Sequence, residues 1–157
     1  MLLGTRHNGA VFSDCKKYRY ALWRIWDESK SSVMFIGLNP STADENNDDP
    51  TIRRVKKFAY DWGFGGVFMT NLFGYISANP DELKKCNDPV GENDHWLKSV
   101  AHVCGIIVCA WGAFDVFSRD KEVLKSFPMV YCLGVNRNGS PKHPLYLKAN
   151  TKLIIYK

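Results

Sequence analysis

Long hydrophobic runs are missing from this 157-residue sequence, and no stretch approaches the length of about 18 apolar residues that a membrane-spanning helix needs. The first seven residues also lack the apolar segment of a secretory signal. We therefore expect a cytoplasmic protein with no membrane partner. Disorder is excluded as well, because 45% of the residues are hydrophobic and only 24% are charged. The length fits a single domain, residues 1–157.

Closely spaced cysteine pairs are missing too. The five cysteines are an odd number, and no two of them have the two-residue separation typical of zinc and iron–sulfur ligands. Cys104, Cys109 and Cys132 lie in apolar runs, which favours small buried side chains in a reducing compartment. We therefore expect no disulfide framework, no metal and no cofactor.

Acidic residues are absent after Glu122. Residues 123–157 consequently carry a net charge of +6, whereas residues 1–122 carry −1. A basic C-terminal region suits an anionic partner such as nucleic acid or a nucleotide phosphate. The alternative is an ordinary solvated basic surface.

Four short apolar runs predict strands that are buried on both faces, which is typical of a parallel sheet. They cover residues 33–38, 66–73, 105–112 and 129–134. An aromatic stretch at residues 18–26 predicts a further strand, paired as an N-terminal β-hairpin with residues 10–12. Residues 152–156 predict an edge strand.

Helices are expected between these runs. Asp49 followed by Pro50 is typical of a helix start, and Gly63 is expected to end that helix. Asp88 and Pro89 repeat the start signal, and a third helix is expected just before Pro128. The fold predicted from this alternation is an α/β three-layer sandwich with a central four-stranded parallel sheet and an N-terminal β-hairpin.

Polar residues follow each of the four predicted parallel strands. Ligands bind beyond the carboxyl ends of such strands, where the connecting loops diverge and helix N-termini point into the crevice. The side chains expected to gather there are Asn39, Asn71, Trp111 and His143. Their concentration at one edge of the sheet predicts the binding site.

These segments resemble motifs of the uracil-DNA glycosylase superfamily. Gly-Leu-Asn-Pro-Ser at residues 37–41 is similar to Gly-Ile-Asn-Pro-Gly of its mismatch-specific branch, and His-Pro at residues 143–144 matches its last motif. Trp-Gly at residues 111–112 and Asn71 also have counterparts there. Nearly the whole chain, including Asp-Asp-Pro-Thr-Ile-Arg-Arg at residues 48–54, resembles the family called domain of unknown function 1643.

The resemblance implies a uracil-DNA glycosylase-like fold and an N-glycosidase-like activity on a base in DNA or on a modified nucleotide. Asn39 and His143 are the expected catalytic residues: His143 can donate to the departing base, and Asn39 can orient water, although an amide is not a general base. Asp44, Asp48 and Asp49 are candidates for a nearby carboxylate. The residues expected to bind substrate are Gly37, Leu38, Pro40, Ser41, Asn71, Phe73, Trp111, Arg53 and Arg54.

Structural roles compete with these assignments. Asn39 can shape a turn, Asn71 can cap a strand, and His143 can be a satisfied structural histidine. For Trp111, a role in packing is favoured over stacking on a base. The acidic segment at residues 44–49 suits either Mg²⁺ or, more simply, a solvated loop ending in a helix cap.

Two basic residues after the acidic segment have two interpretations. Arg53 and Arg54 can bind a phosphate or pair with the acidic loop.

Leu145 or Tyr146, after His143, is a candidate for the apolar wedge that glycosylases insert when they flip a base.

Two other classes of function remain open. The first is a nucleotide-binding or nucleotide-sequestering protein without turnover, which explains an amide at Asn39 where a carboxylate would be more effective. The second is a partner-binding protein that exposes the aromatic segment at residues 18–26. The sequence leaves the oligomeric state open.

Overall fold

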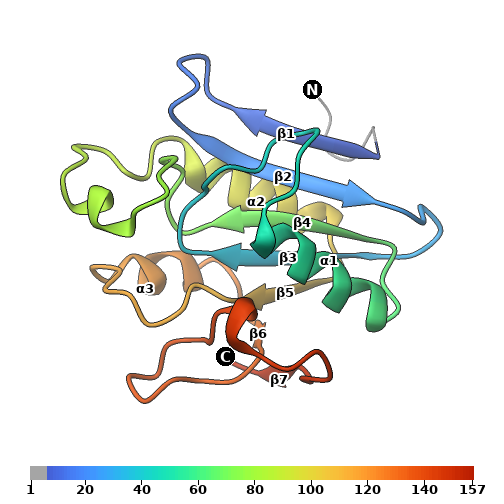
Figure 1. Cartoon of the computed structure of the whole chain (residues 1–157). Helices are drawn as coiled ribbons and strands as arrows, with labels where there is room; N and C mark the ends of the chain where they lie inside the picture. Colours follow the sequence, from blue (N-terminus) through green and yellow to red (C-terminus); the bar gives the residue numbers. More distant parts are fainter. Residues whose placement is uncertain (1–6) are drawn as a thin grey trace.

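The computed structural model describes residues 7–157, and its centre is one seven-stranded sheet (Figure 1). The strand order across the sheet is β1-β2-β4-β3-β5-β6-β7. The strands are β1 (Asn8–Phe12), β2 (Arg19–Ile25), β3 (Ser32–Gly37), β4 (Gly66–Asn71), β5 (Ile106–Cys109), β6 (Tyr131–Cys132) and β7 (Ile154–Ile155). Each lies within or beside a run that the sequence marked as a strand.

The sheet is mixed. β3 pairs in parallel with β4 and β5, and β5 pairs in parallel with β6. The β1–β2 hairpin pairs antiparallel with β4 through β2, and β7 adds an antiparallel edge next to β6. The α/β class is therefore confirmed. The four runs predicted as parallel strands do pair in parallel, in the order β4-β3-β5-β6, but they are part of a seven-stranded mixed sheet and do not form a separate four-stranded one. The expected hairpin does form, and it extends the sheet because β2 pairs with β4.

Helices cover both faces of the sheet. α1 (Pro50–Asp61) packs on one face through Ile52, Val55 and Phe58. α2 (Asn93–Val103) and α3 (Arg119–Leu124) pack in the other apolar cluster, and Figure 1 shows them behind the sheet when α1 lies in front. Short 3₁₀ segments, η1 (Pro80–Lys84) and η2 (Pro144–Tyr146), lie in the connections.

The predicted start is correct for α1 but not for α2. α1 begins as expected, because Asp49 accepts a hydrogen bond from the Ile52 N–H at 2.9 Å and Pro50 occupies the first turn. α2 begins later than predicted. The Asp88 carboxylate instead accepts from the Gly91 N–H at 2.9 Å and closes a turn. The helix expected just before Pro128 is α3, and it begins only at Arg119, because the preceding residue, Ser118, has a φ of 64° that a helix does not accommodate.

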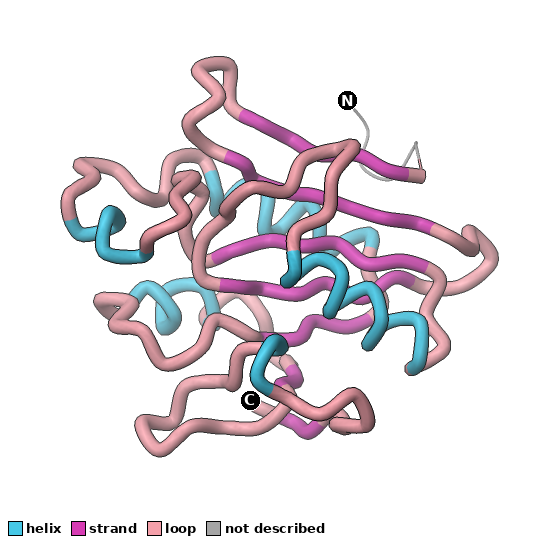
Figure 2. Tube along the Cα trace, viewed as in Figure 1, coloured by secondary structure: helices cyan, strands magenta, loops and turns pink. Residues whose placement is uncertain are grey.

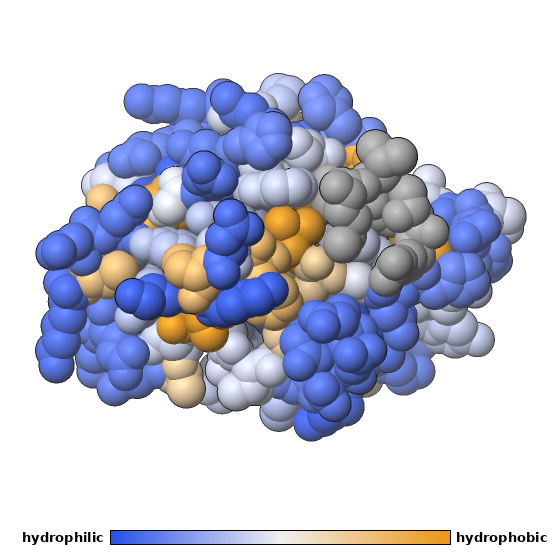
Figure 3. Space-filling view, turned by 90° about the horizontal axis from the view of Figure 1, so that it is seen from above, coloured by the Kyte–Doolittle hydropathy of each residue, from blue (hydrophilic) through white to orange (hydrophobic). Residues whose placement is uncertain are grey.

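Loops dominate the side of the sheet toward which β3, β4 and β5 point (Figure 2). Seen from the β1 edge, the surface is mostly hydrophilic and has one apolar area near its centre (Figure 3). Within residues 7–157, no helix has the length and apolar character required to cross a membrane.

Candidate functional site

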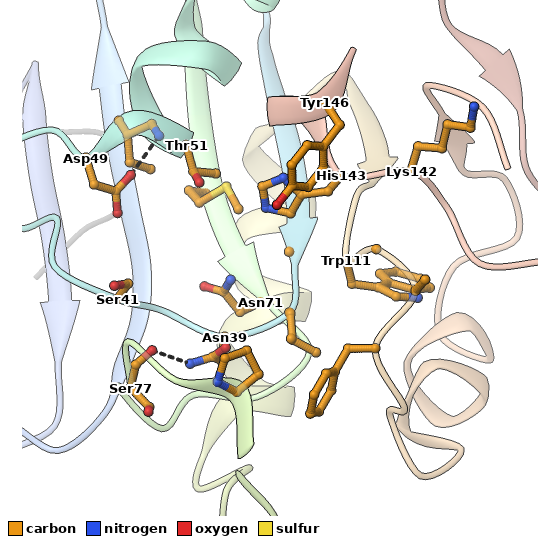
Figure 4. Close-up of a pocket in the computed structure, with 18 of the residues that line it drawn as sticks. Asn39, Ser41, Asp49, Thr51, Asn71, Ser77, Trp111, Lys142, His143 and Tyr146 are labelled. Atoms are coloured by element: carbon orange, nitrogen blue, oxygen red, sulfur yellow. Dashed lines mark hydrogen bonds between the residues drawn. The ribbon is translucent and has the colours of Figure 1, made fainter. Parts of the chain in front are cut away.

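A cavity of about 550 Å³ opens where the loops leave the carboxyl ends of the parallel strands. Figure 4 shows its centre, where Asn39, Asn71 and His143 lie around one space. Asn39 follows β3, Asn71 ends β4, and His143 lies in the long segment after β6. Three polar side chains that are far apart in the sequence are thus brought together by the sheet.

Asn39 is held by its amide nitrogen. Nδ2 donates to the Ser77 carbonyl at 2.9 Å and to the Pro40 carbonyl at 3.1 Å, which uses both of its hydrogens. The Ser77 bond is the dashed line beside Asn39 in Figure 4. The amide oxygen Oδ1 has no hydrogen-bond partner within residues 7–157, so it is left as an acceptor at the cavity.

Asn71 is the most enclosed of the three polar groups. The residue is only 3% exposed, and its side-chain amide has no hydrogen-bond partner in the described part of the chain. Gly37, its neighbour in the parallel register, leaves room for it: a Cβ there would lie 2.8 Å from Asn71 Nδ2. The amide therefore presents both donor and acceptor to the cavity at a buried position.

The protonation state of His143 follows from its surroundings. The Leu145 N–H donates to Nδ1 at 3.2 Å, so the hydrogen of the neutral ring lies on Nε2. Burial lowers the pKa of His143 below its usual value, and the charge of Asp49 opposes that shift only in part. Nε2 has no partner within residues 7–157 and is an available donor at the cavity.

The N-terminal end of α1 forms another part of the wall. Asp49 is the single acid among the lining residues, and its carboxylate is partly occupied as the helix cap. Asp44 and Asp48, the other carboxylates considered above, do not line the cavity: Asp44 bonds to its own loop, and Asp48 pairs with Arg24 and Lys56 at 2.9 Å each. Asp49 is thus the carboxylate that the site can use.

Arg19 at the start of β2 was missed in the sequence. It lines the cavity, is 3% exposed, and donates through Nη1 to the Ala43 carbonyl at 2.9 Å. Nε is buried without a partner. Burial lowers the pKa of Arg19 to about 10, against the opposing charge of Asp49, so the guanidinium stays cationic at neutral pH. Nothing in an aromatic strand pattern indicates that an arginine will face a cavity.

The remaining predicted residues divide into two groups. Gly37, Leu38, Ser41 and Trp111 line the cavity, although Trp111 is only 2% exposed and packs edge-to-face on Tyr156. Pro40, Phe73, Arg53 and Arg54 do not line it.

The four residues outside the cavity have other contacts. Phe73 belongs to the apolar cluster on the side of α2, and Pro40 is buried. Arg53 is exposed and donates to the Asp48 carbonyl at 3.2 Å. Arg54 lies over the Phe58 ring and donates to the Leu147 carbonyl.

Several lining residues have no counterpart in the predicted set. Their polar members include Thr51, Ser77, Asn136 and Lys142. Tyr146, considered above as a wedge, lies at the rim with 87% of its surface exposed and its ring 5.8 Å from the His143 ring. Within residues 7–157, no three His, Cys, Asp or Glu side chains are placed to hold a metal ion.

These features define an α/β protein with a largely polar cavity at the carboxyl ends of its parallel strands. The comparison of sequences places it more narrowly: residues 19–145 match the family described as "Protein of unknown function (DUF1643)", and the chain belongs to that family. No curated protein and no solved structure matches the chain.

Proposed function

We propose that this protein is an N-glycosidase-like enzyme that acts on a base in DNA or on a modified nucleotide. The observation that carries the proposal is the buried amide of Asn71, which faces the cavity without a hydrogen-bond partner in the described chain. An amide that bonds to no group of the fold, at a residue that is only 3% exposed, is available to a ligand with matching groups. The edge of a nucleobase presents a donor and an acceptor side by side and matches such an amide.

Three neighbouring groups supply the chemistry of bond cleavage. As the C1′–N bond breaks, its electron pair moves onto the base, and the sugar gains oxocarbenium character. In this proposal the Nε2–H of His143, which lines the cavity, donates to a base oxygen and stabilises that negative charge. A water then adds to C1′, oriented by Asn39 Oδ1, and gives its proton to the carboxylate of Asp49.

We propose further that the fold is a compact relative of the uracil-DNA glycosylase superfamily. The two motifs that carry the resemblance, residues 37–41 and residues 143–144, both contribute to the wall of the same cavity. This shared placement supports the relationship, because the two motifs lie about 100 residues apart in the sequence and need not have met.

Base release from a panel of substrates tests the activity. The panel contains uracil-containing, mismatched and modified-base DNA together with modified nucleotides, and free base is measured by chromatography. We expect release from at least one substrate and a loss of about 100-fold or more in Asn39→Ala and His143→Ala, the scale of general acid–base catalysis. His102→Ala is the matched control, because His102 is exposed on α2 and lies outside the cavity. Absence of release from every substrate overturns the proposed activity.

A binding protein without turnover is the second candidate. Two observations favour it. The residue after β3 offers an amide, and Asp49, the one acidic residue that lines the cavity within residues 7–157, already uses one carboxylate oxygen as a helix cap. Calorimetry followed by analysis of the recovered ligand separates the two functions. Tight binding with an intact ligand supports sequestration.

A further inference from the structure

Three arginines are buried in the described chain, and only one of them lacks an acidic partner. Arg24 pairs with Asp48 at 2.9 Å, and Arg119 pairs with Asp94 at 2.6 Å. Arg19 is buried to the same degree and forms no ion pair within residues 7–157. An unpaired buried charge is costly, and proteins retain one mainly where something else supplies the counter-charge.

Arg19 lines the cavity and has donors that the fold leaves unused. Its Nη1 is bound to the Ala43 carbonyl, while Nε and Nη2 have no partner among residues 7–157. The hydroxyl groups of Ser41 and Thr51 also line the cavity and also lack partners there. Figure 4 shows these two residues on the side of Asn71 opposite to Trp111 and Lys142. A set of donors with one fixed positive charge suits an oxyanion.

We propose that the cavity binds a free nucleoside monophosphate, with its terminal phosphate on Arg19 and its base on Asn71. This assignment rests on the proposed function, since it takes the base-binding role of Asn71 from there. Thr51 in the first turn of α1 adds a backbone N–H that has no partner in the described chain, and a helix N-terminus favours negative charge. The cavity volume of about 550 Å³ lies in the range of small-molecule sites.

The burial of Arg19 favours the terminal phosphate of a mononucleotide over an internal phosphate of a nucleic-acid strand. An internal phosphodiester continues in two directions, so both neighbouring nucleotides would have to pass the wall around a residue that is 3% exposed. A terminal phosphate has one covalent neighbour and can enter such a position. The acidic segment at residues 44–49 lies beside it and repels the extended negative charge of a duplex.

The negative charge of Asp49 is expected to repel the phosphate, which provides a further test of the assignment. It lines the same cavity, and its charge acts on Arg19 without forming an ion pair. Asn can replace it as a helix cap. Asp49→Asn is therefore expected to bind the phosphate more tightly while losing the proton acceptor for base release.

Calorimetry on the full chain tests the proposal with four probes: nucleoside 5′-monophosphates, the corresponding nucleosides, inorganic phosphate, and a single-stranded oligonucleotide without a terminal phosphate. We expect at least one monophosphate to bind tenfold or more tighter than its nucleoside, as charge-assisted hydrogen bonds imply, and inorganic phosphate to compete with it. Arg19→Met should abolish the preference, and Arg19→Lys should keep part of it. Lys57→Met removes the same charge from an exposed site on α1 and should keep the preference in full.

Equal affinity for monophosphate and nucleoside overturns the proposal, as does failure of every monophosphate to bind. A preference that persists in folded Arg19→Met overturns it too, and so does an oligonucleotide that binds more tightly than every monophosphate. If Arg19→Met does not fold, the Arg19→Lys and inorganic phosphate measurements decide. Arg19-dependent binding without base release supports the phosphate site and removes only the proposed activity.

Discussion

Single residues at this site show how identical side chains take different roles. Asn71 and Asn93 are both buried asparagines next to the end of β4. Asn93 donates to the Asn71 carbonyl at 2.7 Å and to the Leu72 carbonyl at 3.1 Å, so it satisfies backbone groups that water cannot reach. The side chain of Asn71, by contrast, makes no hydrogen bond to the backbone within the described chain. One asparagine supports the fold, and the other is available to a ligand.

The two asparagines should therefore respond oppositely to the same substitution. Asn71→Leu removes an amide that makes no hydrogen bond in the described chain, at similar volume, and should leave the melting temperature unchanged or higher, while ligand binding is lost. Asn93→Leu leaves two buried carbonyls without donors and should lower the free energy of unfolding by about 1–3 kcal/mol. Chemical denaturation of both variants measures the difference. Equal destabilisation would falsify the ligand role of Asn71.

His143 gives a pH dependence whose sign is fixed by its burial. Its pKa in the folded chain lies below the usual 6.5, so the unfolded chain binds the proton more readily. The free energy of unfolding should therefore decrease as pH falls from about 6.5 to the folded pKa. NMR titration of the ring, compared with denaturation curves of wild type and His143→Gln, measures both quantities. A ring that titrates above 6.5, or an unchanged pH slope in His143→Gln, contradicts this assignment.

The sequence predicted part of the site, for reasons that can be stated residue by residue. Asn39, Asn71 and His143 follow apolar strands, and strand ends can be located from the pattern alone. Arg19 was missed because its burial depends on the β1–β2 hairpin joining the sheet, a tertiary event that the local pattern does not encode. Arg53 and Arg54 were placed in the site from their charge, yet their position on α1 directs them to backbone carbonyls, and neither arginine lines the cavity.

At the scale of elements, the sequence predicted a helix start correctly where a capping side chain makes a local hydrogen bond. The cap of Asp49 on α1 is such a case. Asp88 and Pro89 resemble it, but there the carboxylate closes a turn at Gly91, and α2 starts only at Asn93. The pairing partners of β2 and β7 are long-range, so the mixed sheet could not be derived from periodicity.

β2 also anchors the acidic segment through Arg24. Its Nε donates to Asp48 at 2.9 Å, and Nη2 donates to the Asp44 carbonyl at 2.6 Å. Burial alone would raise the pKa of Asp48, but hydrogen bonds from Lys56 and Arg24 outweigh burial and hold it below its usual value. The segment that precedes α1 is thus tied to the sheet by one buried guanidinium.

Arg24→Met should consequently destabilise the protein strongly, by about 3 kcal/mol, because it leaves three backbone carbonyls without this donor and removes one of the two cations that pair with Asp48. Lys57→Met, which breaks only an exposed pair with Asp61 on α1, should cost no more than about 0.5 kcal/mol. Urea denaturation of the two variants provides the comparison. Similar losses in both would show that Arg24 does not anchor the segment.

The whole molecule brings its cavity together from segments that are distant in sequence. Several segments form the lining: β2, the end of β3 and the loop after it, the start of α1, the end of β4 and the loop that leads to η1, the loop after β5, and the segment that includes η2. Each of these is fixed to the sheet by its own strand or helix. A ligand in the cavity therefore contacts the ends of several elements at once and stabilises the folded chain as a unit.

Ligand binding should accordingly protect separate segments together. At a ligand concentration about 100 times Kd, the folded chain gains roughly 2.7 kcal/mol, which raises the melting temperature by several degrees. Hydrogen exchange should then slow in residues 37–41, 49–52, 111–114 and 142–147, all of which contribute to the lining. Residues 96–103 of α2, which do not line the cavity, should change least in local exchange. Protection confined to a single one of these segments would mean that the ligand binds elsewhere and that the shared cavity is not its site.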